Sequence, residues 1–115
     1  MIIAGMLRTM APRIELLWWD GCPSVERALA DLRQAMREAG IDPATIELRE
    51  VASDAQAERE GFAGSPTILI DGHDPFPGDS CIGLSCRVYR TRDGRASPTP
   101  DPAELRAAIG RAMAA

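Results

Sequence analysis

One of the three cysteines, Cys22, stands in a setting that favours a reactive thiol. An almost wholly apolar run, residues 14–19, leads through an Asp-Gly pair to Cys22, and Pro23 follows. Proline is favoured at the first helical position because it has no N–H group to leave unpaired there. A thiol between a strand and a helix start lies beside free backbone N–H groups, which stabilise the thiolate. The pattern predicts that Cys22 is a nucleophile; the alternative is an inert, buried small residue.

The other two cysteines, Cys81 and Cys86, are separated by four residues. They could form a reversible disulfide, serve as a pair of metal ligands or remain free thiols. With His73 or an aspartate they could complete a zinc site, but their spacing matches no strong zinc signature. We expect a secondary redox pair and no metal ion at these cysteines.

The elements that must position Cys22 begin with a strand and a helix. Residues 13–20 are expected to form a central strand buried on both faces. Apolar residues then recur at spacings of three and four over residues 25–40, which predicts a helix ending at a glycine. Apolar and polar residues alternate over residues 45–51, which predicts a strand with one solvent-exposed face. A Ser-x-x-Gln capping box predicts the start of a short helix over 53–60. Strand, helix and strand in this order predict a parallel crossover unit.

The second half of the chain carries weaker patterns. Residues 66–70 form a short β-branched strand headed by a proline and ended by an Asp-Gly turn. Residues 72–85 lack periodicity and are expected to be a loop, followed by a fourth strand over 86–91 and a last helix over 102–113. The arginines from residue 86 onward favour a solvated edge strand and helix over an anion-binding site.

This order of elements predicts that Cys86 lies too far from Cys22 for a disulfide, which requires Cα atoms within ~7 Å. The third strand is expected to run away from Cys22, so the fourth should begin at the opposite end of the sheet. The loop that carries Cys81 can extend to ~45 Å, so its middle could fold back over the sheet.

Length and composition bound the class of protein. The chain has 115 residues, 45% of them hydrophobic and 26% charged, which fits one globular domain. We expect that domain over residues 13–115, after a disordered or misassigned extension over 1–12. A formal charge of −4 argues against a nucleic-acid partner, and no apolar run reaches the ~18 residues that a membrane span needs. Since no secretory signal is evident, a cytoplasmic location is expected, where three cysteines do not indicate a disulfide scaffold.

The order β-α-β-α-β-β-α, with a cysteine after the first strand, resembles the thioredoxin fold. Gly64-Ser65-Pro66-Thr67 resembles that family's cis-proline segment, and the whole pattern is similar to small bacterial thioredoxin-family proteins. The resemblance implies a three-layer α/β fold with a four-stranded mixed sheet. It also implies that the Ser65–Pro66 bond is cis, packs against Cys22 and presents backbone groups to a bound thiol substrate. The expected substrate-binding residues are Trp19, Pro23, Ser24, Ser65, Pro66 and Thr67.

One departure from the family pattern limits the mechanism. The family's dithiol motif has a second cysteine three residues after the first, and this chain has Val25 there. The remaining pattern is similar to a glutaredoxin-like monothiol protein, which attacks a disulfide with one thiolate and needs a second thiol from solution. We therefore expect thiol-disulfide exchange at Cys22 with a low-molecular-weight thiol or a protein disulfide, and no cofactor. The alternative is a non-enzymatic module that binds a soft metal or a partner protein through its cysteines.

Overall fold

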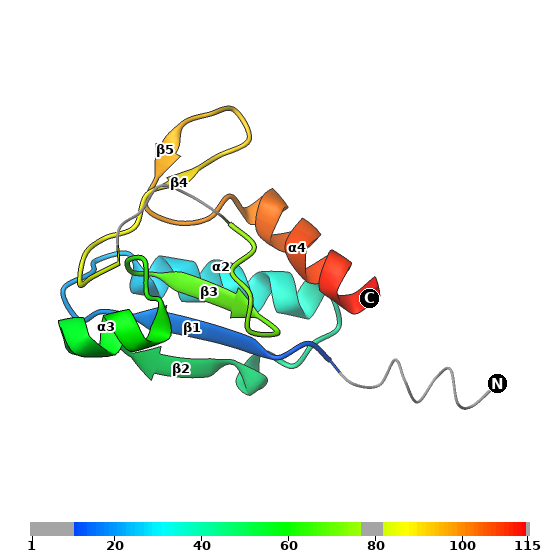
Figure 1. The fold of residues 1–115 in the computed structure, drawn as a ribbon. Helices are drawn as coiled ribbons and strands as arrows, with labels where there is room; N and C mark the ends of the chain where they lie inside the picture. Colours follow the sequence, from blue (N-terminus) through cyan, green and yellow to red (C-terminus); the bar gives the residue numbers. More distant parts are fainter. Residues whose placement is uncertain (1–10, 77–81, 115) are drawn as a thin grey trace.

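The fold is organised on a central strand, β1 (Ile14–Trp18), as the computed structural model shows (Figure 1). The structure describes residues 11–76 and 82–114, so of the expected extension over 1–12 only the last two residues are described. β1 lies between β2 (Glu47–Glu50), with which it pairs parallel, and β3 (Thr67–Ile70), with which it pairs antiparallel. The predicted buried central strand is confirmed, because the first four residues of β1 are buried.

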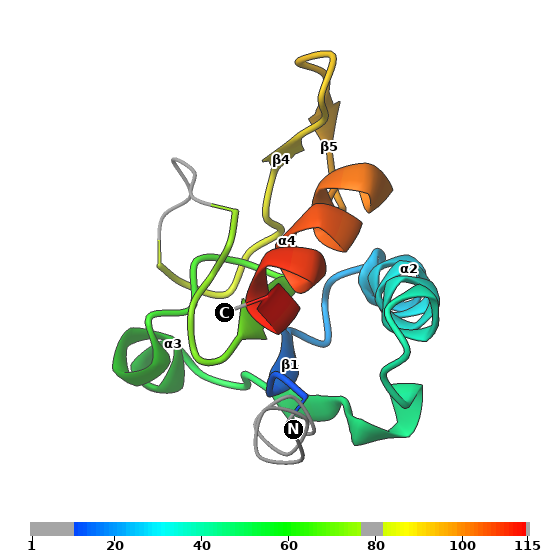
Figure 2. The same cartoon turned by 90° about the vertical axis from the view of Figure 1, so that its right-hand side faces the viewer.

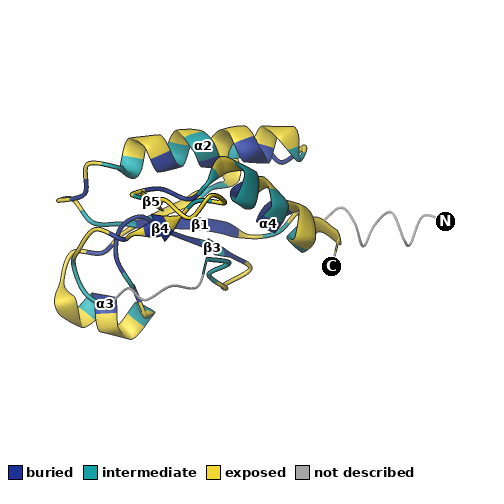
Figure 3. Cartoon of the chain, turned by 90° about the horizontal axis from the view of Figure 1, so that it is seen from above, coloured by how far each residue is buried: buried dark blue, intermediate teal, exposed yellow. Residues whose placement is uncertain are grey.

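Two helices cover one face of this sheet (Figure 2). The helix α2 (Val25–Glu38) connects β1 to β2 through the short turn η1 (Pro43–Thr45), which confirms the predicted parallel crossover. The helix α4 (Pro102–Ala114) packs beside α2, and Figure 3 shows that the buried side of α2 faces the sheet. The core on this face is apolar and includes Ile14, Leu16, Ala28, Leu32, Ala35, Met36, Ile68, Leu105, Ala108 and Ile109.

The third helix, α3 (Asp54–Glu60), lies on the opposite face of the sheet. As the capping box predicts, the hydroxyl of Ser53 accepts a hydrogen bond from the backbone N–H of Gln56 (3.1 Å). The side-chain oxygen of Gln56 accepts in turn from the backbone N–H of Ala52 (3.0 Å). The motif predicts the N–H of the next residue, Ser53, as the donor. A second, smaller apolar cluster forms under α3 and consists of Leu17, Val51, Ala57 and Phe62.

The expected fourth strand of the sheet is not formed as predicted. Cys86 makes a single parallel bridge with Ser65, ahead of β3, and the chain then leaves the sheet. β4 (Tyr89–Arg90) pairs antiparallel with β5 (Ala96–Ser97) in a separate hairpin at the top of Figure 1. A tight turn between these strands supplies a backbone partner close in sequence, which costs less chain entropy than a ladder along β3. The sheet in the described residues is therefore three-stranded and mixed, with a two-stranded hairpin beside it.

Within residues 11–76 and 82–114, no helix has the length and apolar character to cross a membrane. The described part of the chain is an α/β fold in the order β-α-β-α-β-β-β-α.

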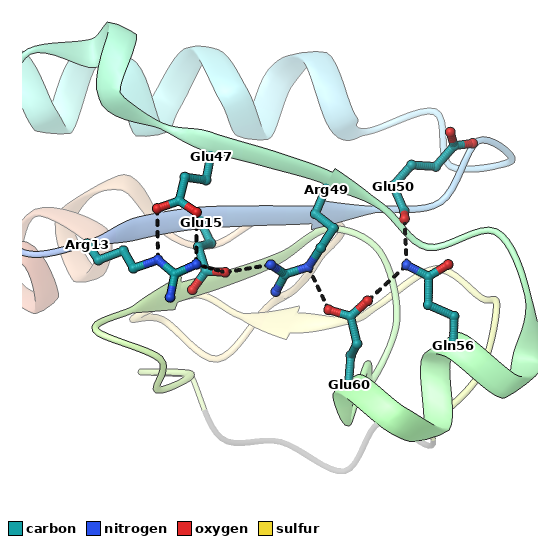
Figure 4. A network of polar contacts seen from close by, with 7 residues as sticks. All are labelled: Arg13, Glu15, Glu47, Arg49, Glu50, Gln56 and Glu60. Atoms are coloured by element: carbon teal, nitrogen blue, oxygen red, sulfur yellow. Dashed lines mark hydrogen bonds and ion pairs between the residues drawn. The ribbon is translucent and has the colours of Figure 1, made fainter.

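A charged network crosses the α3 side of the sheet (Figure 4). Glu15, the one charged residue of β1, is 2% exposed, and its carboxylate lies 2.9 Å from the guanidinium of Arg49 and 3.5 Å from that of Arg13. Arg49 also pairs with Glu60 of α3 (2.6 Å), and Arg13 pairs with Glu47 (2.8 Å). The hydrogen bond from Arg13 lowers the pKa of Glu47. Because Glu15 and Glu47 are direct neighbours across β1 and β2, the arginines offset a like-charge pair.

We expect Glu15→Ala to destabilise the fold by about 1–3 kcal/mol, because it removes one of the two carboxylates that pair with the half-buried guanidinium of Arg49. Urea denaturation followed by circular dichroism measures this loss. The matched control, Glu15→Gln, keeps the volume and one acceptor oxygen and should lose less. An unchanged urea midpoint for Glu15→Ala would show that the network adds nothing to stability.

Candidate functional site

Cys22 lies in the turn between β1 and α2, as the sequence predicts, and is 9% exposed. Its backbone N–H donates to the carbonyl oxygen of Trp19 (3.0 Å), which closes the turn. Its Sγ donates to the carbonyl oxygen of Ser65 (3.4 Å), from the segment that precedes β3. The predicted strand-turn-helix setting and the predicted contact between Cys22 and the Ser-Pro segment are therefore both present.

The helix begins later than the sequence predicts. Val25 is its first residue and Ser24 is the N-cap, so Pro23 lies outside the helix rather than at its first position. The side chain of Ser24 makes no capping hydrogen bond, and its carbonyl oxygen accepts from the N–H of Ala28 (3.0 Å). A start that differs by two residues is within the usual error of locating a helix end from sequence. Pro23 and Ser24 still follow Cys22 in the same turn.

The Ser65–Pro66 peptide bond is cis, as the resemblance implied. Ser65 and Pro66 are buried, and Thr67 is 3% exposed, with its hydroxyl donating to the carbonyl of Gly64 (2.6 Å). The Ser65 hydroxyl accepts from the backbone N–H of Trp19 (3.0 Å). Two hydrogen bonds, from Trp19 and from Cys22, thus fasten Ser65 to the turn that carries the thiol.

The backbone groups that the family would present to a substrate already have partners in this chain. The N–H of Ser65 donates to the carbonyl of Ser85 (2.8 Å), and the carbonyl of Ser65 accepts from the N–H of Arg87 (2.9 Å). These two bonds make the parallel bridge between Ser65 and Cys86. Residues 85–87 therefore occupy the position beside Ser65.

The prediction that Cys86 lies far from Cys22 is wrong. The pKa of the Cys86 thiol is raised, first by partial desolvation and then by the charge of Cys22 and a side-chain hydrogen bond with Cys22. The chain does leave β3 at the far end, but it returns before Cys86, since the N–H of Gly83 donates to the carbonyl of Phe62 (3.1 Å). A connection of about fifteen residues is long enough to run back along the whole sheet.

Both described cysteines are free thiols, Cys22 buried and Cys86 exposed. Cys81 lies outside the described residues, so the expected redox pair of Cys81 with Cys86 stays a prediction. Among residues 11–76 and 82–114, no group of three or more potential metal-ligating side chains is placed to hold a metal ion.

Arg87 is buried, contrary to the expectation of a solvated arginine-bearing strand. Its guanidinium pairs with the carboxylate of Asp74, donates to the carbonyl of Phe76 and lies 4.5 Å from the ring centroid of Tyr89. Gly64 has φ +110, and a Cβ there would lie 3.1 Å from the backbone of Arg87. A glycine is therefore required for the close approach that brings Cys86 to the site.

The two tryptophans lie on opposite faces of the sheet, as adjacent residues at a strand end do. Trp19 packs against the cluster under α3, and a Cβ on Gly21 would lie 2.5 Å from its indole ring. Trp19 therefore covers the turn of Cys22 from one side. Trp18 packs against the larger core and lines a groove on the other side.

This groove opens beside Cys22. Its apolar lining comes from Trp18, Pro23, Val25, Leu29 and Leu48, and its polar side chains are those of Asp20, Glu26 and Glu50. Sequence reasoning missed the contributions of Trp18 and β2. The available signal was the period-two pattern of β2, which places Leu48 and Glu50 on one face. An apolar groove with three carboxylates next to a thiol favours neutral or cationic ligands with an apolar part.

Comparisons with protein-family models, with curated proteins and with solved structures find no match to this chain.

Tyr89 anchors the segment after Cys86, because its hydroxyl donates to the carbonyl of Pro66. Burial raises the pKa of Tyr89. Tyr89 is the only tyrosine, so phenolate absorbance near 295 nm reports on it alone. We expect no ionisation near pH ~10, the ordinary tyrosine range, and a loss of stability as the pH rises above it, since only the unfolded chain releases this proton there.

The chain unfolded in guanidinium is the reference and should ionise near pH ~10. The matched variant Tyr89→Phe should lose about 1 kcal/mol of stability and this component of the alkaline destabilisation. Ionisation of the folded protein in the ordinary range would contradict the buried contact with Pro66.

Proposed function

We propose that this protein is a thiol-disulfide oxidoreductase-like protein in which Cys22 is the nucleophile. The observation that carries the proposal is the position of its Sγ, in a strand-to-helix turn, 3.4 Å from the carbonyl oxygen of Ser65 and beside an open groove. A sulfur at such a turn lies near free backbone N–H groups at the start of a 14-residue helix. A disulfide that enters the groove would contact the sulfur of Cys22, because Cys22 lines the groove and Cys86 does not.

The fold itself fits a variant of the thioredoxin arrangement. The parallel β1-α2-β2 unit, the antiparallel β3 and the final helix α4 occupy the expected order. The departure is the fourth strand, which is reduced to the bridge between Ser65 and Cys86. We propose that this change closes one side of the site and leaves the groove along α2 and β2 as the entry path.

The chemistry requires one disulfide and a source of reducing thiol. The Cys22 thiolate attacks one sulfur of the substrate disulfide, forms a mixed disulfide and expels the other half as a thiolate, which takes up a proton. A thiol from solution then attacks the Cys22 sulfur, releases the bound half and becomes joined to Cys22 in its place. A further solution thiol attacks the sulfur of that joined thiol and expels the Cys22 thiolate, so two solution thiols are oxidised to a disulfide for each substrate disulfide reduced. The first turn of α2 has Val25 where the dithiol motif has its second cysteine, so no neighbouring cysteine in the helix can perform the attack on the Cys22 sulfur.

The groove favours one of the two partner classes. Its three carboxylates disfavour anionic small thiols such as glutathione, and its apolar lining favours an apolar side chain next to the reacting sulfur. We therefore propose a protein disulfide flanked by apolar and basic residues as the substrate, rather than an anionic low-molecular-weight disulfide.

We expect the reduced protein to release thiol from 2-hydroxyethyl disulfide, and Cys22→Ser to lower this rate to the uncatalysed background. Thiol release is followed in a stopped assay at neutral pH, with Cys81→Ser as the matched control that should retain the activity. If no variant releases thiol while the protein retains a soft metal ion stoichiometrically, the non-enzymatic module is the correct alternative.

The same assay tests the proposed substrate class with cystamine, which is cationic, and oxidised glutathione, which is anionic. Because the leaving thiols differ in intrinsic reactivity, the informative quantity is the change in the rate ratio on removing groove charge. In the double variant Glu26→Gln and Glu50→Gln, the preference for cystamine should fall on the order of tenfold. An unchanged ratio would exclude electrostatic selection by the groove.

A further inference from the structure

Cys22 and Cys86 both contact the same residue, Ser65. The Sγ of Cys22 lies 3.4 Å from the Ser65 carbonyl oxygen, and Cys86 is the bridge partner of Ser65, held by backbone hydrogen bonds of 2.8 and 2.9 Å. Bridged backbones lie about 4.8 Å apart, and the paired side chains point to the same face. The hydroxyl of Ser65 points to the N–H of Trp19, at the turn of Cys22, so the thiol of Cys86 faces that turn as well.

We propose that Cys22 and Cys86 form a reversible intramolecular disulfide, with Cys86 as the resolving thiol. This inference rests on the proposed function and changes it from a monothiol to a dithiol mechanism. The helix has Val25 instead of a second cysteine, and Cys86, from a segment distant in sequence, supplies the resolving thiol. The site then needs no second thiol from solution to release its product.

The steps balance as two protein thiols for one substrate disulfide. The Cys22 thiolate attacks the substrate and forms a mixed disulfide, and the first half leaves as a thiolate that is protonated. Cys86 then loses its proton to solvent and attacks the Cys22 sulfur. The second half leaves as a thiolate, and two electrons have moved from the cysteine pair to the substrate. A reduced thiol or dithiol protein of the cell restores the pair.

The electrostatics of Cys86 support this order of attack. Desolvation, the charge of Cys22 and the hydrogen bond with Cys22 all raise the pKa of Cys86 and so favour its thiol form. In a mixed disulfide, the sulfur of Cys22 carries no charge and is a weaker hydrogen-bond acceptor than a thiolate. One of the three causes then disappears and a second weakens, so Cys86 ionises more readily at the step that requires its thiolate.

The surrounding contacts hold Cys86 in place for this role. Arg87 is fixed to Asp74 and to the carbonyl of Phe76, and Tyr89 is fixed to the carbonyl of Pro66. The disulfide displaces one hydrogen bond, from the Cys22 thiol to Ser65, and leaves these anchors intact. On the other side of the bridge, the N–H of Gly83 donates to the carbonyl of Phe62. A segment held on both sides presents its thiol at low entropic cost.

The test is the stoichiometry and the final adduct when the reduced full-length protein reacts with 2-hydroxyethyl disulfide. The wild type should release two thiols for each disulfide consumed and retain no reagent, with a non-reducing tryptic digest linking residues 14–27 to residues 60–87. Cys86→Ala should release one thiol and retain one reagent on Cys22. Since residues 60–87 also contain Cys81, Cys81→Ala is the matched control and should behave as the wild type.

A stable reagent adduct on Cys22 of the wild type would overturn the inference while leaving the monothiol function intact. An adduct retained by Cys81→Ala but resolved by Cys86→Ala would assign the role to Cys81 and also overturn it. If Cys22 takes up no reagent in any variant, the proposed function fails together with the inference. If Cys86→Ala does not fold, the digest of Cys81→Ala decides the question, because Cys86 is then the only cysteine of its 60–87 peptide.

Discussion

The site depends on the hydrogen bonds of one buried serine, Ser65. Its N–H donates to Ser85, its carbonyl accepts from Arg87 and from the Cys22 thiol, and its hydroxyl accepts from the N–H of Trp19. Each of these bonds joins Ser65 to a segment distant in sequence. A fully buried polar residue is costly unless it is satisfied, so these partners hold each other in register. The relative position of the two described thiols follows from this one residue.

The surroundings of the site differ between the two faces of the sheet. Trp19 covers the turn from the α3 side, where the indole lies over Gly21. Further along the same face, the side chain of Glu15 forms ion pairs with Arg13 and Arg49 in place of apolar contacts (Figure 4). The groove on the other face remains the open approach to Cys22, and it carries a negative charge. The groove beside Cys22 and its three carboxylates therefore lie on one side of the sheet.

The sequence was informative wherever local chemistry decides the structure. The apolar run of β1, the spacing of α2 and the serine cap of α3 each specify their element through neighbours a few residues away. The Ser-Pro segment was recognised from its motif. The positions of Cys86 and Arg87 differ from the prediction because they depend on where the chain rejoins the described fold after β3, which no local pattern encodes. A topological argument locates the ends of strands, but not the end of a long connection.

The burial of Arg87 illustrates the same limit. An arginine in a polar segment predicts a solvated side chain, and only its tertiary partners, Asp74 and the ring of Tyr89, compensate its desolvation. The four-stranded sheet was expected from the order of elements, and the hairpin of β4 and β5 diverts the chain after one bridge. That diversion is what leaves Cys86 beside the thiol of Cys22 rather than inside a strand.

The central claim is that Cys22, and not the more accessible Cys86, is the nucleophile. The most direct measurement is the order of alkylation of the reduced Cys81→Ser protein by substoichiometric iodoacetamide at neutral pH, located by peptide mass spectrometry. Exposure alone predicts that Cys86 reacts first, because Cys22 is buried. The account predicts that Cys22 is alkylated first, because its sulfur lies at the strand-to-helix turn, whereas desolvation and the nearby Cys22 raise the pKa of Cys86. Alkylation of Cys86 ahead of Cys22 would contradict the account.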